Sequence, residues 1–282
     1  MYNLNKNNFL VAPVLKWVGG KRQLIEIFLD LIPENFSYYC EPFLGGGALF
    51  FYLQPKNAFI NDINSDLILV YKIIRDDVEN LISELENFKN NSDFFYYVRN
   101  LDRNKEIFNS LSDVQRAARI IFLNKTCYNG LYRVNNSGEF NSPFGNYKNP
   151  NIINAPVLRA VSKYFNSAQI HLTSVDYAEI LAEIPKKTFV YLDPPYDPIS
   201  TTSNFTGYSK GGFNRDEQIR LKESCDFLTA NNIKFMLSNS KTDFILNLYS
   251  SYNITIVQAK RSINSVGSGR GNVEEIVVRN YG

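Results

Sequence analysis

The sequence predicts an α/β fold with a mainly parallel sheet and one large insertion. Three observations support this: apolar segments that end at polar residues alternate with helical patterns, three adjacent glycines follow the first such segment, and residues 89–165 hold no obvious buried parallel strand. A chain of 282 residues is long enough for one core plus an inserted lobe. We assign the core to residues 1–66 and 166–282, and the insertion to residues 67–165.

The first part of the chain predicts a β-α-β unit. Its expected order is a helix after Leu24 that Pro33 ends, a strand over 38–41, a glycine turn at 45–47, a short helix ended by Pro55, a strand over 58–60, and a helix over 66–88. The second strand ends at Asn61-Asp62. Polar residues therefore follow a buried strand at a sheet edge.

The insertion is polar, aromatic and basic. Ser112 and Gln115 form a capping box for a helix that runs to about Lys125, and Gly138 suits the turn of a hairpin between residues 131–135 and 140–141. From Arg99 to Lys163 there are ten Lys or Arg residues against four Asp or Glu residues, although the whole chain carries only +2. Such a surface attracts phosphate backbones, but a solvated positive face without a partner would also explain it.

The sheet resumes after the insertion. The expected elements are strands over 170–175, 189–192 and 234–237, a helix over 215–230 capped by Asn214 with Glu217, and a closing antiparallel pair over 254–258 and 275–278. The glycine-rich stretch 200–212 is expected to be a mobile loop that orders on substrate.

Composition excludes several classes of protein. The chain is 44% apolar with neither a signal peptide nor a membrane-length apolar run, so we expect a soluble, cytoplasmic protein. Cys40, Cys127 and Cys225 are far apart, which favours reduced buried thiols over disulfides or a zinc site. His171 is the only histidine and is expected to be a strand residue, so no metal is predicted.

The most informative segment is Phe189–Tyr196, in which an apolar strand stops at Asp193-Pro194-Pro195-Tyr196. Neither proline can continue a strand ladder, so the chain leaves the sheet at the edge where open α/β sheets bind their ligands. Asp193 offers an acceptor, a proline offers a carbonyl, and Tyr196 offers a flat face. This combination suits an amino group on a planar ring.

A second pattern indicates a nucleoside cofactor. Gly45–Gly47 allow a ligand to approach the backbone, and Asp62, at the end of the next strand, suits ribose hydroxyls. The spacing Gly-x-Gly-x-x-Gly of dinucleotide sites is absent, which favours S-adenosylmethionine because that molecule has no phosphate. Methyl transfer from a sulfonium to an aromatic amine depends on alignment and electrostatics more than on acid or base strength. A base in a duplex would have to flip out to reach such a pocket.

The motifs Lys16-Trp-Val-Gly-Gly-Lys21, Glu41-Pro-Phe-Leu-Gly-Gly-Gly47, Asn61-Asp62 and Asp193-Pro-Pro-Tyr196 occur in the order of the Dam family of D12-class N6-adenine-specific DNA methyltransferases. The resemblance covers nearly the whole chain. Within the insertion, residues 128–133 and 138–147 are similar to the target-recognition hairpin of members that methylate adenine in GATC. The resemblance implies a Rossmann-like S-adenosylmethionine-dependent methyltransferase fold, with a mainly parallel seven-stranded sheet and an inserted, mostly helical target-recognition lobe plus β-hairpin.

The resemblance also implies roles for individual residues. Those expected to bind S-adenosylmethionine, which would leave as S-adenosylhomocysteine, are Trp17, Lys21, Phe43, Gly45, Asp62, Asp176, Tyr177 and Asp193. The catalytic segment that would hold the flipped adenine comprises Asp193, Pro194, Pro195 and Tyr196. The residues expected to contact double-stranded DNA are Lys16 and Arg133 at guanines, Leu131 and Pro143 at a thymine methyl, Tyr128 or Asn129 in the gap left by the adenine, and Tyr147.

Two positions depart from the family pattern. Asn146 replaces an expected basic residue, and Tyr177 stands where members often carry phenylalanine. The first change removes a potential phosphate contact. A cognate restriction endonuclease in the same system is a further expected partner, although not in a stable complex, and no membrane partner is expected.

Three alternatives stay open at this point. An RNA adenine or protein amide N-methyltransferase could use the same pocket, and only the recognition hairpin argues against it. An NAD-dependent dehydrogenase would explain the glycines and Asp62 but leaves Asp193–Tyr196 without a role. A catalytically silent DNA-binding protein would bind a duplex without transferring a methyl group.

Overall fold

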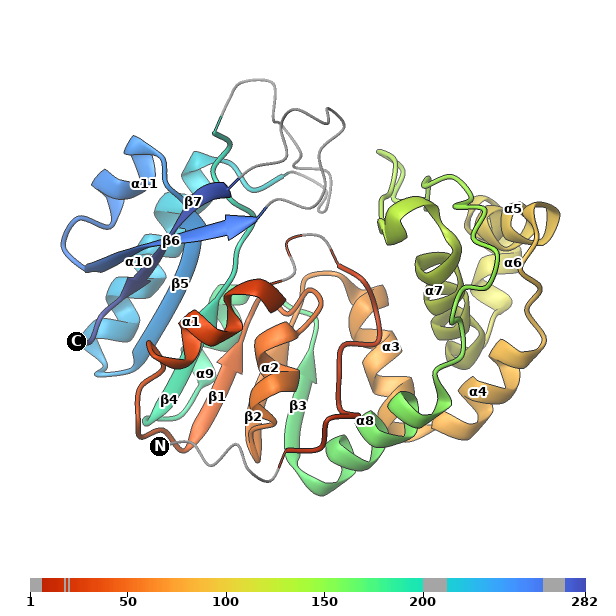
Figure 1. Ribbon diagram of the computed structural model, residues 1–282, viewed down its shortest axis with the longest axis horizontal. Coiled ribbons are helices and arrows are strands. Elements are labelled where there is room, and N and C mark those ends of the chain that lie inside the picture. The colour runs from red at the N-terminus through yellow and green to blue at the C-terminus, as the bar shows by residue number, and fades with distance from the viewer. Residues whose placement is uncertain (1–6, 18, 20, 200–211, 261–271) are drawn as a thin grey trace.

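The computed structural model describes residues 7–17, 19, 21–199, 212–260 and 272–282. Its centre is a seven-stranded sheet with the order β3-β2-β1-β4-β5-β7-β6 (Figure 1). The strands are β1 (Tyr38–Glu41), β2 (Asn57–Asn61), β3 (Gln169–Thr173), β4 (Thr188–Leu192), β5 (Lys234–Ser240), β6 (Asn253–Lys260) and β7 (Asn272–Arg279). Strand β7 is antiparallel to both of its neighbours, and the other described pairs are parallel. This confirms the predicted sheet and its closing antiparallel pair.

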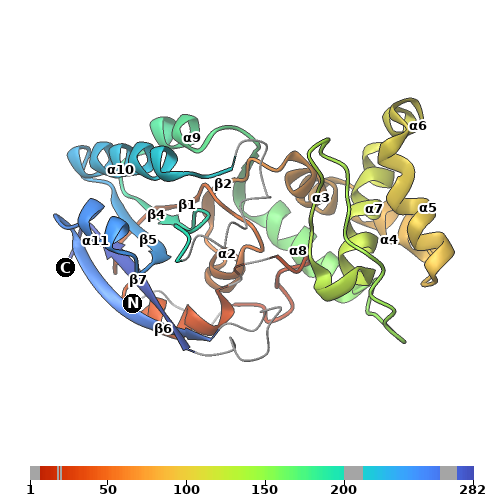
Figure 2. The ribbon, with the colours of Figure 1, turned by 90° about the horizontal axis from the view of Figure 1, so that it is seen from above.

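Strand β4 shows how the core is divided into two layers. Successive side chains of a strand point to opposite faces. Phe189 and Tyr191 accordingly belong to one apolar cluster, whereas Val190 and Leu192 belong to the other. The second cluster packs under α9 (Tyr177–Glu183), α10 (Arg215–Ala230) and α11 (Asp243–Leu248). Figure 2 shows α9 and α10 side by side on one face of the sheet, with α1 (Ile25–Leu29) and α2 (Ala48–Leu53) on the other.

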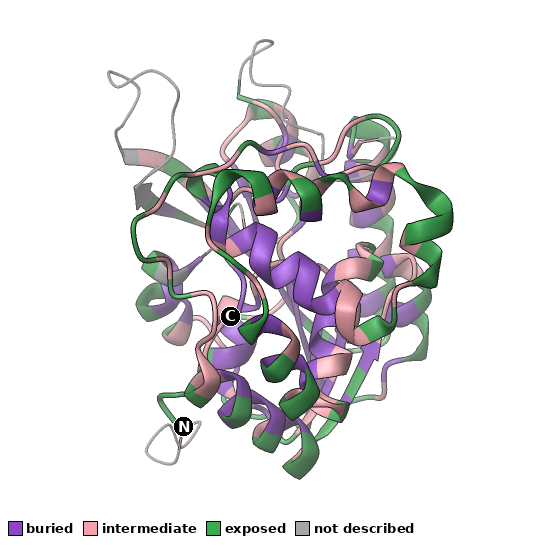
Figure 3. Ribbon diagram, turned by 90° about the vertical axis from the view of Figure 1, so that its right-hand side faces the viewer, coloured by how far each residue is buried: buried purple, intermediate pink, exposed green. Residues whose placement is uncertain are grey.

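The chain between β2 and β3 forms a helical lobe on the right of Figure 1. Its helices are α3 (Ser65–Asp76), α4 (Val78–Glu86), α5 (Ser92–Asn100), α6 (Lys105–Ser110), α7 (Asp113–Thr126) and α8 (Ala155–Ser167). The 3-10 turns are η3 (Leu101–Arg103) and η4 (Tyr128–Gly130), and η2 (Arg22–Leu24) precedes α1. Seen from the lobe's side, the buried residues face inward and the exposed ones follow the outer turns (Figure 3).

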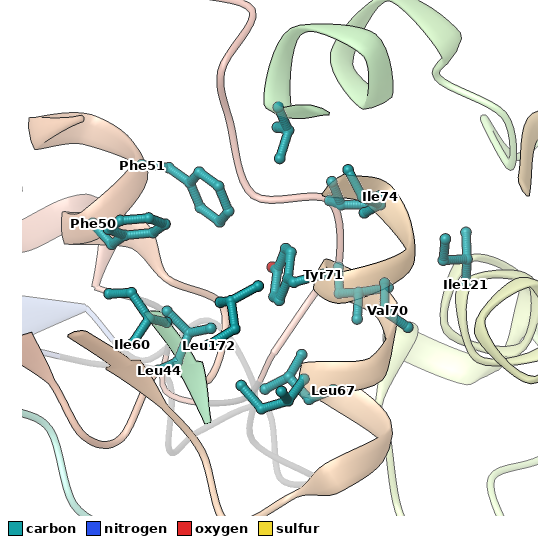
Figure 4. Close-up of a cluster of buried hydrophobic side chains, with 14 of the residues drawn as sticks. Leu44, Phe50, Phe51, Ile60, Leu67, Val70, Tyr71, Ile74, Ile121 and Leu172 are labelled. Carbon is teal, nitrogen blue, oxygen red and sulfur yellow. The ribbon is translucent and has the colours of Figure 1, made fainter. Parts of the chain in front are cut away.

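One apolar cluster runs from the sheet into this lobe. Phe51 of α2 contacts Tyr71 of α3 with ring centroids 5.5 Å apart, and Ile74 and Ile121 continue the same cluster toward α7 (Figure 4). Helix α3 packs against α7 and α8 as well as β3. The lobe is therefore joined to the sheet by buried apolar contacts, in addition to the two chain connections after β2 and before β3.

One sequence prediction is wrong in detail. The single helix over 66–88 is broken at Asp77, whose φ of −150° and ψ of 49° lie outside the helical range, and an aspartate tolerates such a turn. The predicted hairpin is confirmed: its turn lies at Gly138, Val134 and Phe140 pair in antiparallel fashion, and the Asn135 and Asn141 N–H groups donate across it to the carbonyls of Glu139 and Arg133, each at 2.9 Å. The pairing is short, so side-chain contacts add to its hold.

Most other elements are confirmed. Ser112 and Gln115 make the reciprocal capping box of α7, and the Asn214 side chain accepts the Glu217 N–H at the start of α10. His171 lies on β3, and the three cysteines are free and buried. Residues 200–211 of the expected mobile loop lie outside the described residues. No helix in the described ranges is long and apolar enough to cross a membrane.

Candidate active site and nucleic-acid interface

Three acidic residues reach one edge of the sheet because their strands are parallel neighbours. Strand β1 pairs with β2 on one side and β4 on the other, and these strands are followed by, or end at, Glu41, Asp62 and Asp193. Burial raises the pKa of Glu41 well above its ordinary value, and its Oε2 accepts a hydrogen bond of 2.6 Å from Tyr39 Oη. The edge therefore concentrates acceptors in a desolvated place.

Asp62 is fixed by the backbone. Its Oδ2 accepts the Gly45 N–H at 2.8 Å and its Oδ1 accepts the Asn64 N–H at 2.9 Å. Burial raises its pKa to about 6, although both hydrogen bonds oppose that rise. Each carboxylate oxygen keeps a further lone pair, as a ligand with two adjacent hydroxyls requires.

Gly45 is a position that only glycine fits. Its φ is +48°, and a Cβ atom there would lie 2.9 Å from Cδ1 of Trp17. The indole of Trp17 therefore lies directly over the glycine turn. The structure thus brings Trp17, Gly45 and Asp62 together, as the sequence predicts.

Lys21 and Tyr196 gather around Asp193. Lys21 Nζ lies 3.1 Å from Asp193 Oδ1 and 4.4 Å from the centroid of the Tyr196 ring, and it donates to the Gly19 carbonyl at 2.9 Å. Tyr196 Oη donates to Glu275 Oε2 at 2.9 Å. Burial raises the pKa of Asp193, and the charge of Lys21 limits that rise.

A polar network behind the sheet holds the Asp193–Tyr196 turn. Gln218 of α10 donates to the Pro195 carbonyl at 2.9 Å, and Asn239 at the end of β5 donates to Gln218 Oε1 at 3.0 Å. Asn239 also accepts the Asp197 N–H at 3.1 Å. The Pro195 carbonyl is thereby engaged, so the Pro194 carbonyl remains the candidate for a ligand amine.

Asp176 and Tyr177 lie at the start of α9, where Asp176 caps the helix. Arg220 forms a bidentate pair with the Asp176 carboxylate at 2.8 and 2.9 Å, which lowers the pKa of Asp176, and its guanidinium lies 4.3 Å from the Tyr177 ring centroid. Phe43 contacts Tyr177 with ring centroids 5.1 Å apart. Phe43, Tyr177 and Phe213 therefore form an aromatic wall.

The site fits S-adenosylmethionine on two observations. Asp193 Oδ1 is buried and paired with Lys21 Nζ at 3.1 Å, and within the described chain Tyr177 Oη is a buried oxygen without a hydrogen-bond partner. Buried polar atoms of this kind usually have a partner. The free capacity of Asp62 is the second observation. No group of three or more His, Cys, Asp or Glu residues in the described chain could hold a metal ion.

The predicted DNA-contacting residues form a second group around η4. Asn124 of α7 accepts the Lys16 N–H at 2.9 Å and donates to the Lys16 carbonyl at 2.8 Å, so the backbone of Lys16 is fixed while its side chain is exposed. Trp17 stacks on Tyr132 with centroids 5.0 Å apart. Residues 16 and 17 therefore join the recognition lobe to the glycine turn.

Tyr128 and Asn129 lie at the tip of this group. Both are exposed, Asn129 has a φ of +58°, and its N–H donates to Tyr147 Oη at 2.9 Å. The Tyr128 N–H donates to the carbonyl of Pro143, which is itself exposed, at 2.8 Å. The structure thus assembles four of the predicted DNA contacts on one surface.

Leu131 and Arg133 extend this surface along the hairpin. Arg133 is exposed and its Nε donates to Asn141 Oδ1 at 2.7 Å, which holds the guanidinium beside its own hairpin. The carbonyl of half-buried Leu131 accepts the Ser142 hydroxyl. Among the described residues Arg133 makes no contact with the Asp193 corner, so the predicted DNA-contacting and catalytic residues lie on different elements.

The seven-stranded, mostly parallel sheet, with acidic side chains gathered at one edge, is the fold of the S-adenosylmethionine-dependent methyltransferases. The family follows from comparison. The model of the D12 class N6 adenine-specific DNA methyltransferases matches residues 17–263, and the chain belongs to that family. Membership implies S-adenosylmethionine as the methyl donor.

Curated relatives agree along almost the whole chain. The type II methyltransferase M1.LlaDCHI of Lactococcus lactis subsp. cremoris is 42% identical over 281 residues and covers 99% of both chains. The type II methyltransferase M.MjaIII of Methanocaldococcus jannaschii is 43% identical and covers 96% of this chain and 99% of its own. The DNA adenine methylase of Escherichia coli K12 is 34% identical and covers 93% of each. The protein is therefore an adenine-specific DNA methyltransferase, which answers the dehydrogenase alternative.

Sequence reasoning missed several residues that complete the site. Glu275, Gln218 and Arg220 contact predicted site residues from distant segments, Asn239 holds Gln218, and Asn124 fixes Lys16. Asn239 follows the end of a predicted strand, which was a usable signal. Asn124 interrupts an apolar helical run, which was another. Glu275 carried no such signal, because alternation in β7 predicts only that it is polar.

Proposed function

We propose that the enzyme transfers a methyl group to the N6 amino group of adenine in double-stranded GATC, after flipping the base out of the helix. The observation that best supports this is the corner formed by Asp193, Tyr196 and Lys21, where an acceptor and an aromatic face lie side by side. An exocyclic amine beside a planar ring is the matching ligand.

Each residue of the corner has a role in this proposal. The Asp193 carboxylate and the Pro194 carbonyl accept the two N–H groups of the adenine amine, and Tyr196 stacks on its ring. These hydrogen bonds favour a tetrahedral nitrogen whose lone pair faces the methyl group. Pro195 keeps the turn in place through its bond from Gln218. A base that stacks on the face where Lys21 now lies must displace its ammonium group.

The donor is proposed to bind along the neighbouring strand ends. Asp62 accepts the ribose hydroxyls, Phe43 and Tyr177 line the adenine beside Asp176, and Gly45 allows close approach under Trp17. The Tyr177 hydroxyl, buried without a described partner, would gain one there. The bound cofactor supplies a methyl group on a positively charged sulfur, and the protein positions the nucleophile. A sulfonium leaving group calls for no Lewis acid, so we propose that no metal takes part and that S-adenosylhomocysteine is released.

The DNA surface is proposed to read the site from the inserted domain, residues 67–165. Lys16 and Arg133 contact guanines, Leu131 and Pro143 contact a thymine methyl, and Tyr128 or Asn129 fills the gap left by the adenine. Tyr147 supports this tip through its bond to the Asn129 N–H. The basic balance of the lobe provides the attraction to phosphates.

The cellular setting is proposed from the relatives. Two are named type II methyltransferases, which suggests a cognate restriction endonuclease acting on the same sequence without a stable complex. Others are named DNA adenine methylases. Either role belongs in the cytoplasm, where DNA is accessible.

A labelled-methyl assay tests the proposal. The enzyme is incubated with tritiated S-adenosylmethionine and a duplex carrying GATC, duplexes changed at each base in turn, and RNA of the same sequence. We expect label in the GATC duplex, recovered as N6-methyladenine after digestion to nucleosides. Equal label in all duplexes would refute the target sequence, and label in RNA alone would refute the substrate.

A further inference from the structure

We infer that a buried ionic cluster of Asp102, Arg103 and Arg119 positions the recognition hairpin, and that sequence discrimination depends on it. These three residues belong to no proposed DNA or cofactor contact. The inference rests on the proposed function for its link to GATC, but the structural part concerns only the hold on the hairpin.

Asp102 and Arg103 bind the two backbone polar groups of one hairpin residue, Phe140. Asp102 Oδ2 accepts the Phe140 N–H at 2.8 Å, and Arg103 donates to the Phe140 carbonyl at 2.8 Å. Asp102 is 7% exposed and Phe140 is 2% exposed. Both backbone groups of Phe140 are thus satisfied by side chains from η3, a distant segment of the chain.

Arg119 ties the same carboxylate to the body of the lobe. Its guanidinium lies 2.6 Å from Asp102 Oδ2 and donates to the carbonyls of Val98 and Arg99 at the end of α5. Arg119 is 2% exposed although it lies in the middle of α7. A buried charge is tolerated only when it is paired and hydrogen-bonded, and the Arg119 guanidinium meets both requirements.

The hairpin has other ties as well: Tyr132 Oη donates to Asp66 Oδ2 of α3 at 3.0 Å, and the Tyr132 ring stacks on Trp17. The one described bridge of the hairpin joins Val134 to Phe140, and a cavity of about 220 Å³ opens beside it. Asp102, Arg119, Tyr132 and Phe140 all line that cavity. Apolar packing comes from the Phe140 and Tyr132 rings, 5.7 Å apart. The cluster is therefore the main polar link between the hairpin and α7.

The cluster also fixes the position of Arg133 and Leu131, the proposed base-reading residues of the hairpin. Asn141, whose side chain orients Arg133, directly follows Phe140, and its N–H donates to the Arg133 carbonyl at 2.9 Å. A hairpin that moves at Phe140 moves the proposed base-reading side chains as a unit. Because base contacts need fixed geometry, loss of the cluster should reduce discrimination among sequences more than overall affinity for DNA.

The test uses Asp102→Asn and Arg103→Met in the full chain, with Arg159→Gln as the matched control. Arg159 forms an exposed bidentate pair with Glu79 in the same lobe and does not touch the hairpin. Arg103 is partly exposed, so its variant should fold even if Asp102→Asn does not. Thermal melting and S-adenosylmethionine titration identify folded variants.

Two readouts are measured on folded protein. Hydrogen exchange in peptides spanning 131–141 should be at least about tenfold faster in both variants and unchanged in the control. The ratio of methylation rates on GATC to those on single-base-changed duplexes should fall about tenfold, as expected when a base contact is lost, with S-adenosylmethionine affinity within about twofold of wild type. Arg103→Lys keeps a positive charge at this position, so both readouts should change less in this variant than in Arg103→Met.

The outcomes separate the two proposals. Unchanged exchange in folded Arg103→Met overturns the inference, and so does faster exchange with an unchanged discrimination ratio. A wild-type enzyme that prefers a different duplex refutes GATC alone, and the ratio is then taken on the preferred duplex. The exchange measurement needs no activity and tests the cluster in either case.

Discussion

The sheet edge and the recognition hairpin are built in opposite ways. At the edge, Asp62 and Asp193 follow strands that have hydrogen-bonded neighbours on both sides. The hairpin has one described bridge, between Val134 and Phe140, instead of a ladder, and its proposed reading residue Arg133 is exposed. Backbone hydrogen bonds of the sheet therefore hold the proposed catalytic residues, whereas a few side-chain contacts hold the residues proposed to recognise DNA.

This difference has a functional meaning. A methyl transfer that is identical in every member of the family needs one geometry, which a parallel sheet supplies. Recognition has to differ between targets, and a hairpin held by side chains can change without disturbing the sheet. We therefore expect substitutions in the two regions to affect different measured quantities.

The largest effect is expected at the sheet edge. Asp193→Ala removes a proposed acceptor for the adenine amine, so the methylation rate should fall roughly a thousandfold, the scale of a lost electrostatic contact in a transition state. Duplex affinity should change little, because the DNA surface lies on the lobe. Single-turnover methylation and duplex titration measure these quantities.

The control for this variant is Asp76→Ala, which removes an exposed carboxylate paired with Arg75. Its methylation rate should equal that of the wild type. Turnover of Asp193→Ala within tenfold of wild type would contradict the role of Asp193 and would weaken the contrast between the two regions.

The next effect is expected on the hairpin. Arg133→Ala should lower discrimination at one guanine by about 1 to 3 kcal/mol, with the methylation rate on saturating cognate duplex little changed. Rates on duplexes with one base changed, compared with Arg159→Ala, measure this. An unchanged preference at every base would show that Arg133 does not read the sequence.

A third prediction uses pH. Because burial raises the pKa of Asp62 to about 6, this group is protonated in the folded protein below that pH and loses acceptor capacity for a ribose. S-adenosylmethionine affinity should fall by up to about tenfold per pH unit below pH 6 and level off above pH 7. Calorimetric titration from pH 5 to 8 measures it.

The Asp62→Asn variant separates Asp62 from the other acids. It should bind weakly at pH 8 and lose this pH dependence, whereas Asp76→Asn should keep the wild-type profile. The same raised pKa acts oppositely on folding: the Asp62 contribution to the unfolding free energy is largest below pH 4 and declines as the pH rises through 6. A flat affinity profile for the wild type would contradict the ribose contact.

The smallest effect is expected at Asn146. Its φ is +51°, a left-handed conformation that asparagine adopts more readily than most residues, so backbone geometry gives a reason for the missing basic residue. Asn146→Lys should strengthen binding to all duplexes alike and steepen the slope of log affinity against log salt concentration by about one unit. Backbone strain at the left-handed position should make the gain in affinity smaller. Duplex titration at several salt concentrations measures this, and a change confined to GATC would contradict it.

The sequence predicted the sheet edge better than the hairpin. Strand ends at Asp62 and Asp193 follow from local patterns, since prolines and polar residues mark where a buried strand stops. The break at Asp77 was not predicted, because two short helices and one long one share the same apolar spacing. The hairpin and its turn were predicted from Gly138 and the flanking residues, but its ties to η3 and α3 were not.

Long-range polar contacts explain the rest of the difference. The bonds from Glu275 to Tyr196 and from Asp102 to Phe140 join residues 79 and 38 positions apart, and no local pattern records them. A buried arginine at position 119 resembles any helical arginine until its partners are known. Such contacts appear only once the chain is folded.

The stacking of Trp17 between the glycine turn and Tyr132 carries one last consequence. The indole separates the proposed donor-binding edge of the sheet from the lobe proposed to contact DNA. If occupancy of either side shifts the ring, thermodynamic linkage requires each ligand to alter the affinity of its counterpart by the same factor. Binding of the two substrates would then be coupled through a single aromatic side chain.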